Sequence, residues 1–495
     1  MYSSYSSLQQ SQLAAQGYYD TQSTYLLVYA PGRNTALRAT LADQLHRKFR
    51  LADTLGSALT EGVDGVLLVS EDVECMSTAL MCFAKALQEG ADYAVCDAVF
   101  GFGGATALYQ SRAHLAQNRC ALVSRPLLER CRAAAKDPEN VTELLALAAQ
   151  FCAHPARIPQ ALLHYERDIC AEDAFSATGK RAFLMSHVLD MTGAPIVLVS
   201  AVPVLRSMGY EVVVLGPSDG GALQLFVDAG AAVITRPGIR ATPNLWGLAL
   251  CTDLVLVNTV VMARTVRALS GTAVPVLWWL HDAFAGYPHI AHQIPTKLAE
   301  NVRLYSVGHH AANAMHAVRP DFQIGQLIYG LPDYAAEDFP RCDLGYPADK
   351  PLFATVGSFE RRKGQDIFCK AIRLLPPETM KKASFLFVGK AAEPEMMDAV
   401  RSLTADCPDN VFYVKRLTRD EIKSLMAQCT CLVCASRDDP MPTFVTEGLI
   451  FGKPAIVSEH TGTAGLITEG VDGFVYKDDD PDQLAKVLEL SLIHI

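Results

Sequence analysis

Short apolar runs alternate with longer segments of helical periodicity along most of this chain. After residue 180 the apolar runs lie at residues 182–185, 211–215, 232–234, 254–257, 276–280 and 303–306. Helical stretches lie between most of them. Apolar strands that alternate with helices are typical of a parallel sheet covered by helices on both faces.

A turn at residues 329–333 interrupts this pattern, which then resumes. The later apolar runs lie at residues 352–356, 385–388, 412–414, 432–433 and 455–457. We therefore predict two consecutive Rossmann-like domains, residues 181–332 and 333–495, joined by a hinge near Gly330. Ligands of such sheets bind beyond the carboxyl ends of the strands, so we expect the substrate between the two domains.

The first third of the chain also alternates strands and helices, and residues 24–167 are predicted to form an α/β domain of their own. Strands are expected at residues 25–30, 65–70 and 93–99, and helices at residues 34–49 and 76–88. The polar residues 168–180 are predicted to be a linker. Residues 1–23, rich in Ser, Gln and Tyr, are predicted to be a disordered lead-in.

The composition of the chain argues against several classes of protein. A chain of 495 residues is too long for one core, and a hydrophobic fraction of 50% argues against disorder over most of it. The net charge of −10 argues against nucleic-acid binding through a broad basic face. The longest apolar run, residues 194–205, is too short to span a bilayer.

The start of the chain lacks the basic and apolar regions of a signal peptide, and 14 cysteines lie in apolar segments. We therefore expect a cytoplasmic protein with reduced, buried thiols. Cys431 and Cys434 have Cys-x-x-Cys spacing within a strand-like run. Core packing is the main interpretation, and a metal or redox role is the alternative.

Two carboxylates, Asp439 and Glu447, flank a loop stiffened by Pro440 and Pro442. Asp439 follows a strand-like run, and Glu447 is predicted to begin a short helix. Carboxylates accept strong hydrogen bonds from hydroxyl groups, so the pair suits a polyhydroxylated ligand. The alternative is a solvated loop before a helix, where acidic residues are favoured anyway.

A cationic turn precedes the acidic pair. Gly357 ends a predicted strand, and Arg361, Arg362 and Lys363 come before a helix that is expected to begin near Gly364. A helix N-terminus attracts anions and nearby cations strengthen the site, so a diphosphate is the natural ligand. The alternative is a solvated basic turn.

Together these motifs resemble family 4 glycosyltransferases, which have the GT-B fold. That family carries Glu, seven residues, then Glu, followed by a Gly-Lys-Pro turn such as residues 452–454; here the first Glu is Asp439. The resemblance covers residues 181–488. It implies an α/β enzyme that moves a hexosyl group from a nucleoside diphosphate sugar to a hydroxyl acceptor, with retained configuration and no metal or other cofactor.

The resemblance also implies roles for individual residues. Lys363 aligns with the lysine of the family's diphosphate clamp, and Arg361 or Arg362 would replace the arginine that the family has at the position of Ser358. Asp439 would hold the hydroxyls of the donor sugar and Glu447 those of the ribose. Glycine turns of the family lie beside the donor, which implicates Gly193, Gly357 and Gly462.

His281 ends an apolar strand, at a place where family members often have a histidine near the transferred sugar. It is therefore expected to orient the sugar or the acceptor, and His281, Asp439 and Lys363 are the implied catalytic residues. His187, which ends an earlier strand, is open to a functional or a purely structural role.

Residues 64–73 resemble a different group, the strand and metal loop of family 2 glycosyltransferases, which have the GT-A fold. Those enzymes hold a divalent ion with Asp-x-Asp, but Ser70 stands here for the first Asp. Losing a carboxylate weakens a site for a hard cation. We therefore expect residues 24–167 to be a degenerate, non-catalytic domain; an active one that uses Glu71 and Asp72 is the alternative.

The expected partners are a nucleotide-sugar donor and a saccharide or lipid-linked acceptor, in polysaccharide or glycoconjugate synthesis, with no nucleic acid. Peripheral association with the inner face of a membrane stays open. The alternative functions are a GT-B nucleotide-sugar epimerase and a non-catalytic scaffold that binds sugar nucleotides. The end of the chain, residues 482–495, is expected to be truncated, because GT-B proteins usually finish with a helix that crosses back to the first domain.

Overall fold

The computed structural model describes residues 21–494 except for a small set: residues 22, 33, 57, 60–61, 103–104, 112–118, 177–178, 219, 240–245, 332, 334–338, 340–341 and 478. The predicted lead-in lies outside the described residues apart from residues 21 and 23. The chain divides into two compact units. Unit 1 comprises Met1–Met191, Ala201–Leu256 and Gly271–Val276, and unit 2 comprises Thr192–Ser200, Val257–Ser270 and Leu277–Ile495.

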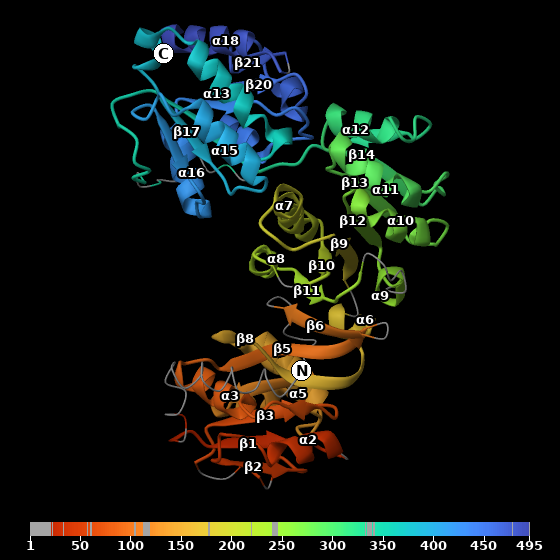
Figure 1. The fold of residues 1–495 in the computed structure, drawn as a ribbon. Helices are drawn as coiled ribbons and strands as arrows, with labels where there is room; N and C mark the ends of the chain where they lie inside the picture. The colour runs from red at the N-terminus through yellow and green to blue at the C-terminus, as the bar shows by residue number, and fades with distance from the viewer. Residues whose placement is uncertain are drawn as a thin grey trace. The chain divides into compact units, whose positions relative to one another are not determined.

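Unit 1 is built on a mixed sheet, drawn from red to yellow-green in Figure 1. Its strands, in spatial order, are β2 (Phe49–Ala52), β1 (Leu26–Tyr29), β3 (Gly65–Val69), β7 (Cys120–Ser124), β5 (Tyr93–Phe102), β6 (Ala105–Ser111), β11 (Ala232–Thr235), β10 (Tyr210–Gly216) and β9 (Lys180–Met185). Neighbouring strands are parallel at both ends of this series, from β2 to β3 and from β11 to β9. From β3 through β7, β5 and β6 to β11, each neighbouring pair is antiparallel.

Helices and two further strands complete unit 1. The strands are β4 (Glu74–Cys75) and β8 (Pro155–Asp168), which pair with each other, and β8 also pairs with β5. The helices are α2 (Thr35–Leu41), α3 (Ala79–Gln88), α4 (Arg125–Ala134), α5 (Val141–Phe151), α6 (Ala171–Ala174), α8 (Leu223–Asp228) and α9 (Trp246–Leu250). Helix α7 (Gly193–Ser207) has residues in both units. The apolar β1 and β3 are buried along their whole length, as the sequence predicts.

The predicted helix at residues 34–49 is wrong over its second half. Helix α2 ends at Leu41, and the chain turns to enter β2. Gln44 explains the early end: its side-chain amide donates to the carbonyls of Cys75 and Met76 and accepts from the N–H of Leu80. These bonds fix a buried polar side chain in place of another helical turn.

Unit 2 holds one group of strands before residue 330 and a complete sheet after it. The first group is β12 (Leu254–Asn258), β13 (Val276–Leu280), β14 (Val302–Ser306) and β15 (Ile324–Gln326), in that order, and the first residues of β12 and β13 belong to unit 1. Short 3-10 turns and helices connect them: η3 (Val260–Met262), α10 (Ala263–Leu269), η4 (Phe284–Gly286), α11 (Tyr287–Ile290), η5 (Ala291–Gln293) and α12 (His309–His316).

The sheet after residue 330 has six strands, all parallel, in the order β18-β17-β16-β19-β20-β21. They are β16 (Leu352–Val356), β17 (Ser384–Val388), β18 (Val411–Val414), β19 (Cys431–Cys434), β20 (Ala455–Ser458) and β21 (Gly473–Tyr476). In chain order this is 3-2-1-4-5-6, the doubly wound order of dinucleotide-binding domains. The Rossmann-like prediction for this part of the chain is therefore confirmed.

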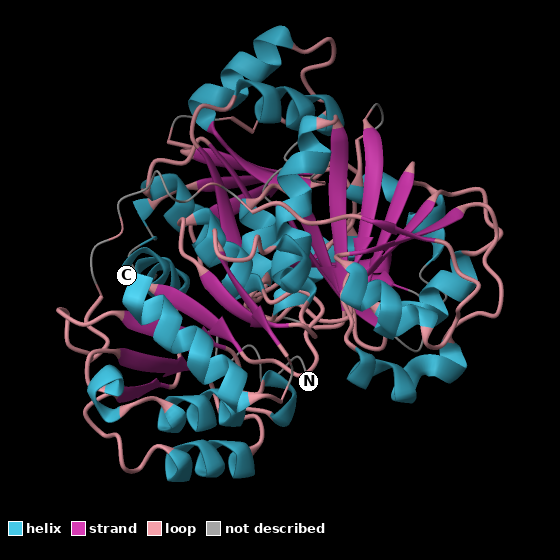
Figure 2. Ribbon diagram, turned by 90° about the horizontal axis from the view of Figure 1, so that it is seen from above, coloured by secondary structure: helices cyan, strands magenta, loops and turns pink. Residues whose placement is uncertain are grey.

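Helices cover both faces of this sheet: η6 (Arg361–Lys363), α13 (Gln365–Leu374), α14 (Pro377–Met380), α15 (Pro394–Leu403), α16 (Arg419–Gln428), α17 (Thr443–Ile450), η7 (Gly462–Leu466) and α18 (Pro481–His494) (Figure 2). Alternate strand residues enter two separate cores. Phe353 and Phe385 pack on one face, and Leu352 and Leu386 pack on the other.

Cys431 and Cys434 are buried in these opposite cores. Two thiols on opposite faces of one strand cannot share a metal ion, so the prediction that they are core residues is confirmed.

Among the helices that the structure describes, none combines the length and the apolar character that a membrane crossing needs.

Candidate functional site

The cationic turn and the acidic loop lie at the same edge of the six-stranded sheet. Strands β16 and β19 are neighbours, and the cationic turn follows β16 while the acidic loop follows β19. The strand order reverses between these two strands, since β17 continues from β16 on one side and β20 from β19 on the other. In doubly wound sheets, ligands bind in the crevice that such a reversal opens.

Lys363 and Asp439 form an ion pair at this switch point. The Nζ of Lys363 lies 2.6 Å from Oδ2 of Asp439, and their side chains are 18% and 5% exposed. Gly364, which follows Lys363, has a left-handed φ of 65°, and a Cβ added there would lie 1.8 Å from the carbonyl oxygen of Ala435. Glycine is therefore required for the turn to reach the end of β19.

Two other predicted glycines, Gly357 and Gly462, lie beside Lys363 and Asp439. A Cβ on Gly357 would lie 3.7 Å from the Lys363 side chain, so the lysine runs over this glycine. The N–H of Gly462 donates to the carbonyl of Asp439 at 2.9 Å, and a Cβ on Gly462 would lie 1.7 Å from the carbonyl oxygen of Pro440. Gly462 thus fixes the acidic loop by close backbone approach.

The two candidate arginines differ in position. Arg362 donates to the carbonyl of Asp438 at 2.8 Å and to Glu360 at 2.9 Å. The Arg361 side chain is exposed, and the backbone N–H of Arg361 donates to Glu393 at 2.9 Å. Of the two side chains, that of Arg362 is therefore the one that bonds to Asp438 in the acidic loop.

Glu447 is buried and paired with a residue that the sequence did not single out. Its Oε1 lies 2.6 Å from a guanidinium nitrogen of Arg419, the first residue of α16, and the Glu447 side chain is 6% exposed. The prediction that Glu447 begins the helix is wrong, because α17 already begins at Thr443, behind Pro442. Glu447 consequently projects from the second turn and not from the helix end.

Tyr329 is buried near the two acids without a hydrogen bond to either that the structure records. Its hydroxyl hydrogen-bonds with Oγ1 of Thr446 at 3.1 Å. Burial raises the pKa of Tyr329, and the charges of Asp439 and Glu447 raise it further. The Tyr329 hydroxyl therefore lies in the field of both carboxylates, although the sequence indicated only a turn there.

Two further predicted site residues, Gly193 and His281, belong to segments that precede residue 330. Gly193 begins α7, and a Cβ on it would lie 3.7 Å from Cγ2 of Thr443, at the start of α17. His281 follows β13, and its ring packs edge-on against Trp279 at 4.6 Å between centroids. His187 belongs to unit 1, where it follows β9.

Asp438 is a site residue that the sequence analysis missed. It accepts hydrogen bonds from the backbone N–H groups of Phe284 and Ala285, at 3.2 and 2.9 Å, and from Nε2 of His310 at 2.7 Å. Burial acts to raise the pKa of Asp438, but the bonds from His310 and the two amides outweigh it and hold the pKa below its usual value. The sequence feature that could have indicated Asp438 is the pair of consecutive acids, Asp438 and Asp439, after a predicted strand.

The residues of the GT-A-like loop in unit 1 are engaged in other contacts. Asp72 accepts from the N–H groups of Thr35, Ala36 and Leu37 and so caps α2. Glu71 pairs with Arg167 at 2.7 Å. Among the residues that the structure describes, no group of three or more His, Cys, Asp or Glu side chains is placed to hold a metal ion.

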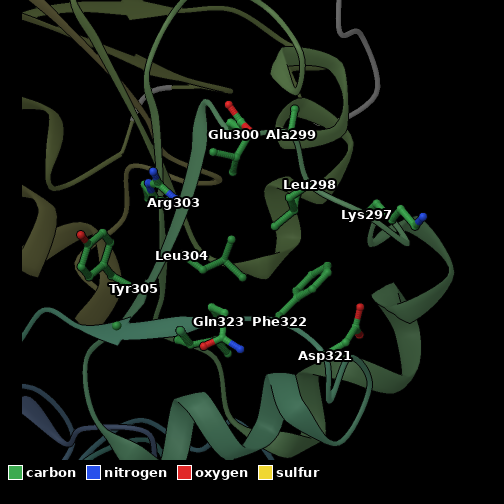
Figure 3. Close-up of a pocket in the computed structure, with 13 residues that line it drawn as sticks. Lys297, Leu298, Ala299, Glu300, Arg303, Leu304, Tyr305, Asp321, Phe322 and Gln323 are labelled. Atoms are coloured by element: carbon green, nitrogen blue, oxygen red, sulfur yellow. The ribbon is translucent and has the colours of Figure 1, made fainter.

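Unit 2 also contains a pocket of about 700 Å³ along β14 and β15. Leu298, Leu304 and Phe322 lie around its middle, and charged side chains lie nearer its rim (Figure 3). None of the site residues that the sequence predicts belongs to its lining.

Two family models match separate parts of this chain. Residues 178–316 match the family described as Glycosyl-transferase family 4, and residues 338–493 match Glycosyl transferases group 1. Among similar proteins, the uncharacterized glycosyltransferase MJ1178 of Methanocaldococcus jannaschii is 27% identical over 139 residues. The alpha-maltose-1-phosphate synthase of Mycobacterium tuberculosis is 25% identical over 144 residues. These matches cover 27% and 28% of this chain and 36% of each relative.

Solved structures match over a longer part of the chain. The crystal structure of Anabaena Alr3699/HepE in complex with UDP and glucose has a TM-score of 0.53 and 18% identity, and the match covers 63% of this chain and 89% of that one. The sucrose-phosphate synthase of Thermosynechococcus elongatus has a TM-score of 0.51 and 17% identity, with 63% and 90% covered. Identities this low establish the fold alone, which is GT-B. Residues 178–316 and 338–493 thus match two glycosyltransferase family models, and the chain shares the GT-B fold of the similar solved structures.

Proposed function

We propose that this chain moves a hexosyl group from a nucleoside diphosphate sugar to a hydroxyl group of an acceptor. The observation that carries the proposal is the Lys363–Asp439 pair at the strand-order switch, with Arg362 and the N-terminus of α13 beside it. This edge presents cations to a diphosphate and a carboxylate to sugar hydroxyls within one site.

In this proposal, Lys363 and Arg362 stabilise the negative charge that develops on the diphosphate as its bond to the anomeric carbon breaks. An ammonium group has three N–H donors, so Lys363 can hold a phosphate oxygen while it keeps its bond to Asp439. Asp439 accepts hydrogen bonds from the donor sugar, Glu447 accepts them from the ribose, and His281 orients the sugar or the acceptor. We include retention of configuration, which the resemblance to family 4 implies, and independence of metal ions, because Lys363 and Arg362 would supply the positive charge that a metal ion supplies in other enzymes.

UDP-glucose is the first donor to test, since a structure with the same fold holds UDP and glucose. Other similar proteins are named glycogen synthase and lipopolysaccharide core biosynthesis glycosyltransferase LpsE. They support a saccharide or lipid-linked acceptor and a role in polysaccharide or glycoconjugate synthesis. We also propose a cytoplasmic location, at the inner face of the membrane where the acceptor is a lipid; thiols without disulfide bonds support it.

We further propose that residues 24–167 are a degenerate GT-A-like domain without catalytic activity. The roles of Glu71 and Asp72 support this proposal. Asp72 is committed to the N-terminus of α2 and Glu71 to Arg167. A divalent ion would have to displace both sets of contacts.

Substitution of Lys363 tests the proposed function. With donor saturating and no metal added, Lys363→Ala should lower turnover about 100-fold, a loss near 3 kcal/mol of transition-state stabilisation. Lys381→Ala, which removes an exposed lysine of the same sheet domain, is the matched control. Unchanged turnover in Lys363→Ala would contradict the assignment.

Two further measurements separate the alternatives. An epimerase would return a labelled nucleotide sugar with an altered sugar and without transfer to the acceptor. A non-catalytic scaffold would bind nucleoside diphosphate in calorimetry without turning over the donor.

A further inference from the structure

Asp438 and Asp439 are consecutive, but their side chains serve different neighbours. Asp439 pairs with Lys363 inside the six-stranded sheet domain. The Asp438 carboxylate, whose side chain is 15% exposed, accepts the N–H groups of Phe284 and Ala285 and the imidazole of His310. Three donors converge on one largely buried carboxylate, and bonds to an ionised acceptor are the stronger kind.

The donors come from two segments that precede residue 330. Phe284 and Ala285 form the start of η4, three and four residues after His281. His310 lies in the first turn of α12, and its ring packs edge-on against Phe284 at 5.2 Å between centroids. Asp438 therefore ties together η4 and α12 at the loop that carries Asp439.

The backbone also approaches closely at this junction. A Cβ on Gly308, which precedes α12, would lie 3.1 Å from Cε of Met441 and 3.8 Å from the carbonyl oxygens of Pro440 and Gly462. The start of α12 thus packs directly on the loop that holds Asp439. Hydrogen bonds and close backbone packing therefore join η4 and α12 to this loop at the same place.

We propose that Asp438 is a positioning residue: it docks the segment that follows His281 onto the acidic loop and so sets His281 relative to Asp439 and Lys363. This inference rests on the proposed function for the identity of the reacting groups. Since a misplacement of about 1 Å can lower a rate 100-fold, loss of docking should reduce turnover and leave nucleotide binding intact.

The test uses the full chain with Asp438→Asn and Asp438→Ala, and Asp406→Asn as a matched control. Asp406 is an exposed acid of the same sheet domain that pairs with Arg373. Hydrogen exchange of the peptide that covers residues 281–290 reports docking directly, because two of its amides bond to Asp438. We expect at least 10-fold faster exchange of these amides in both Asp438 variants and no change in the control.

Kinetics and calorimetry then report positioning. With UDP-glucose as donor, turnover should fall 10- to 100-fold in Asp438→Asn, while the dissociation constant of UDP changes less than about 2-fold. His310→Gln keeps an N–H donor and should retain most of the turnover that His310→Ala loses. A merely structural role would move stability and nucleotide binding together and would show no such rescue.

Failure of the inference about Asp438 and failure of the proposed function give different results. Unchanged exchange in the Asp438 variants, or unchanged turnover in Asp438→Asn, overturns the inference. If the native chain neither binds UDP nor transfers a sugar from any donor tried, the proposed function fails, and the exchange comparison still decides whether Asp438 docks the segment.

Discussion

Arg419 forms an ion pair with Glu447 that fixes the direction of the Glu447 side chain. The pair is 2.6 Å apart, with Glu447 almost fully buried and Arg419 about one-third exposed. A buried carboxylate without a partner is costly, and it would also repel the phosphates of a nucleotide bound nearby. Arg419 therefore compensates the charge of Glu447 while leaving it in place for the ribose that the proposed function assigns to it.

We predict that Arg419→Ala weakens binding of UDP about 10-fold, or ~1.4 kcal/mol, with a smaller loss for Arg419→Lys. Calorimetric titration of each variant measures the effect. Arg373→Ala, which removes a half-exposed arginine paired with Asp406, should bind as the native chain does. Equal dissociation constants for native and Arg419→Ala would show that Glu447 needs no compensation.

At the scale of elements, the cationic turn depends on one backbone conformation. Gly364 ends η6 and begins α13 with a φ of 65°, and its Cα faces the Ala435 carbonyl at the end of β19. The turn can therefore place Lys363 beside Asp439 only while residue 364 has no side chain. Gly452, which follows α17, has nearly the same φ of 66° but nothing within 4 Å of an added Cβ.

These two glycines give a matched comparison. Gly452→Ala should lower the free energy of unfolding by about 1 kcal/mol, the cost of a left-handed alanine. Gly364→Ala should cost about 3 kcal/mol, because the added methyl also forces apart the turn and β19. Chemical denaturation measures both, and UDP affinity should fall only in Gly364→Ala. Equal stability losses would indicate that the turn relaxes without disturbing β19.

Elements with a strong apolar run were predictable from the sequence. The runs at residues 352–356 and 385–388 coincide with β16 and β17, because strands buried on both faces need continuous apolar residues. Strand β21 went unpredicted, since Gly473 opens it and only two of its four residues are buried. The end of α2 was missed because it depends on contacts of Gln44 with residues about 30 positions later.

The site was predictable only in part, for a similar reason. Spacing and strand ends located Lys363 and Asp439, and the structure places them in contact. Spacing could not tell that Asp438 faces η4 and α12, because consecutive loop residues have no fixed side-chain direction. Nor could it find Arg419 or Tyr329, whose partners are distant in sequence.

Across the molecule, the buried aspartates Asp173, Asp366 and Asp438 on one hand and Asp282 on the other have opposite dependence on pH. In both units, burial acts to raise the pKa of Asp173, Asp366 and Asp438, but bonds from Arg167, Arg437 and His310 outweigh it and hold each pKa below the usual value. A depressed pKa in the folded state stabilises the protein above the pKa of the unfolded state. That stabilisation is lost as the pH falls through the folded value, so acid should destabilise both units below about pH 4.

Asp282, next to His281, behaves in the opposite way. Burial raises its pKa from 3.8 to about 6, although the N–H groups of Val260 and His281 act to lower it. Between these two values the folded chain binds a proton that the unfolded chain does not. The contribution of Asp282 to stability is therefore complete below about pH 4 and is lost as the pH rises through 6.

We predict that Asp282→Asn flattens the stability profile between pH 4.5 and pH 7.5, as asparagine still accepts the Val260 N–H but does not titrate. The denaturation midpoint of the native chain should carry a downward component through pH 6 that the variant lacks, and the two profiles should differ most above pH 6. Asp406→Asn, at an exposed acid, should follow the native profile throughout. Parallel profiles for native and Asp282→Asn would mean that Asp282 titrates alike in the folded and unfolded chain, and that burial beside His281 does not hold its proton.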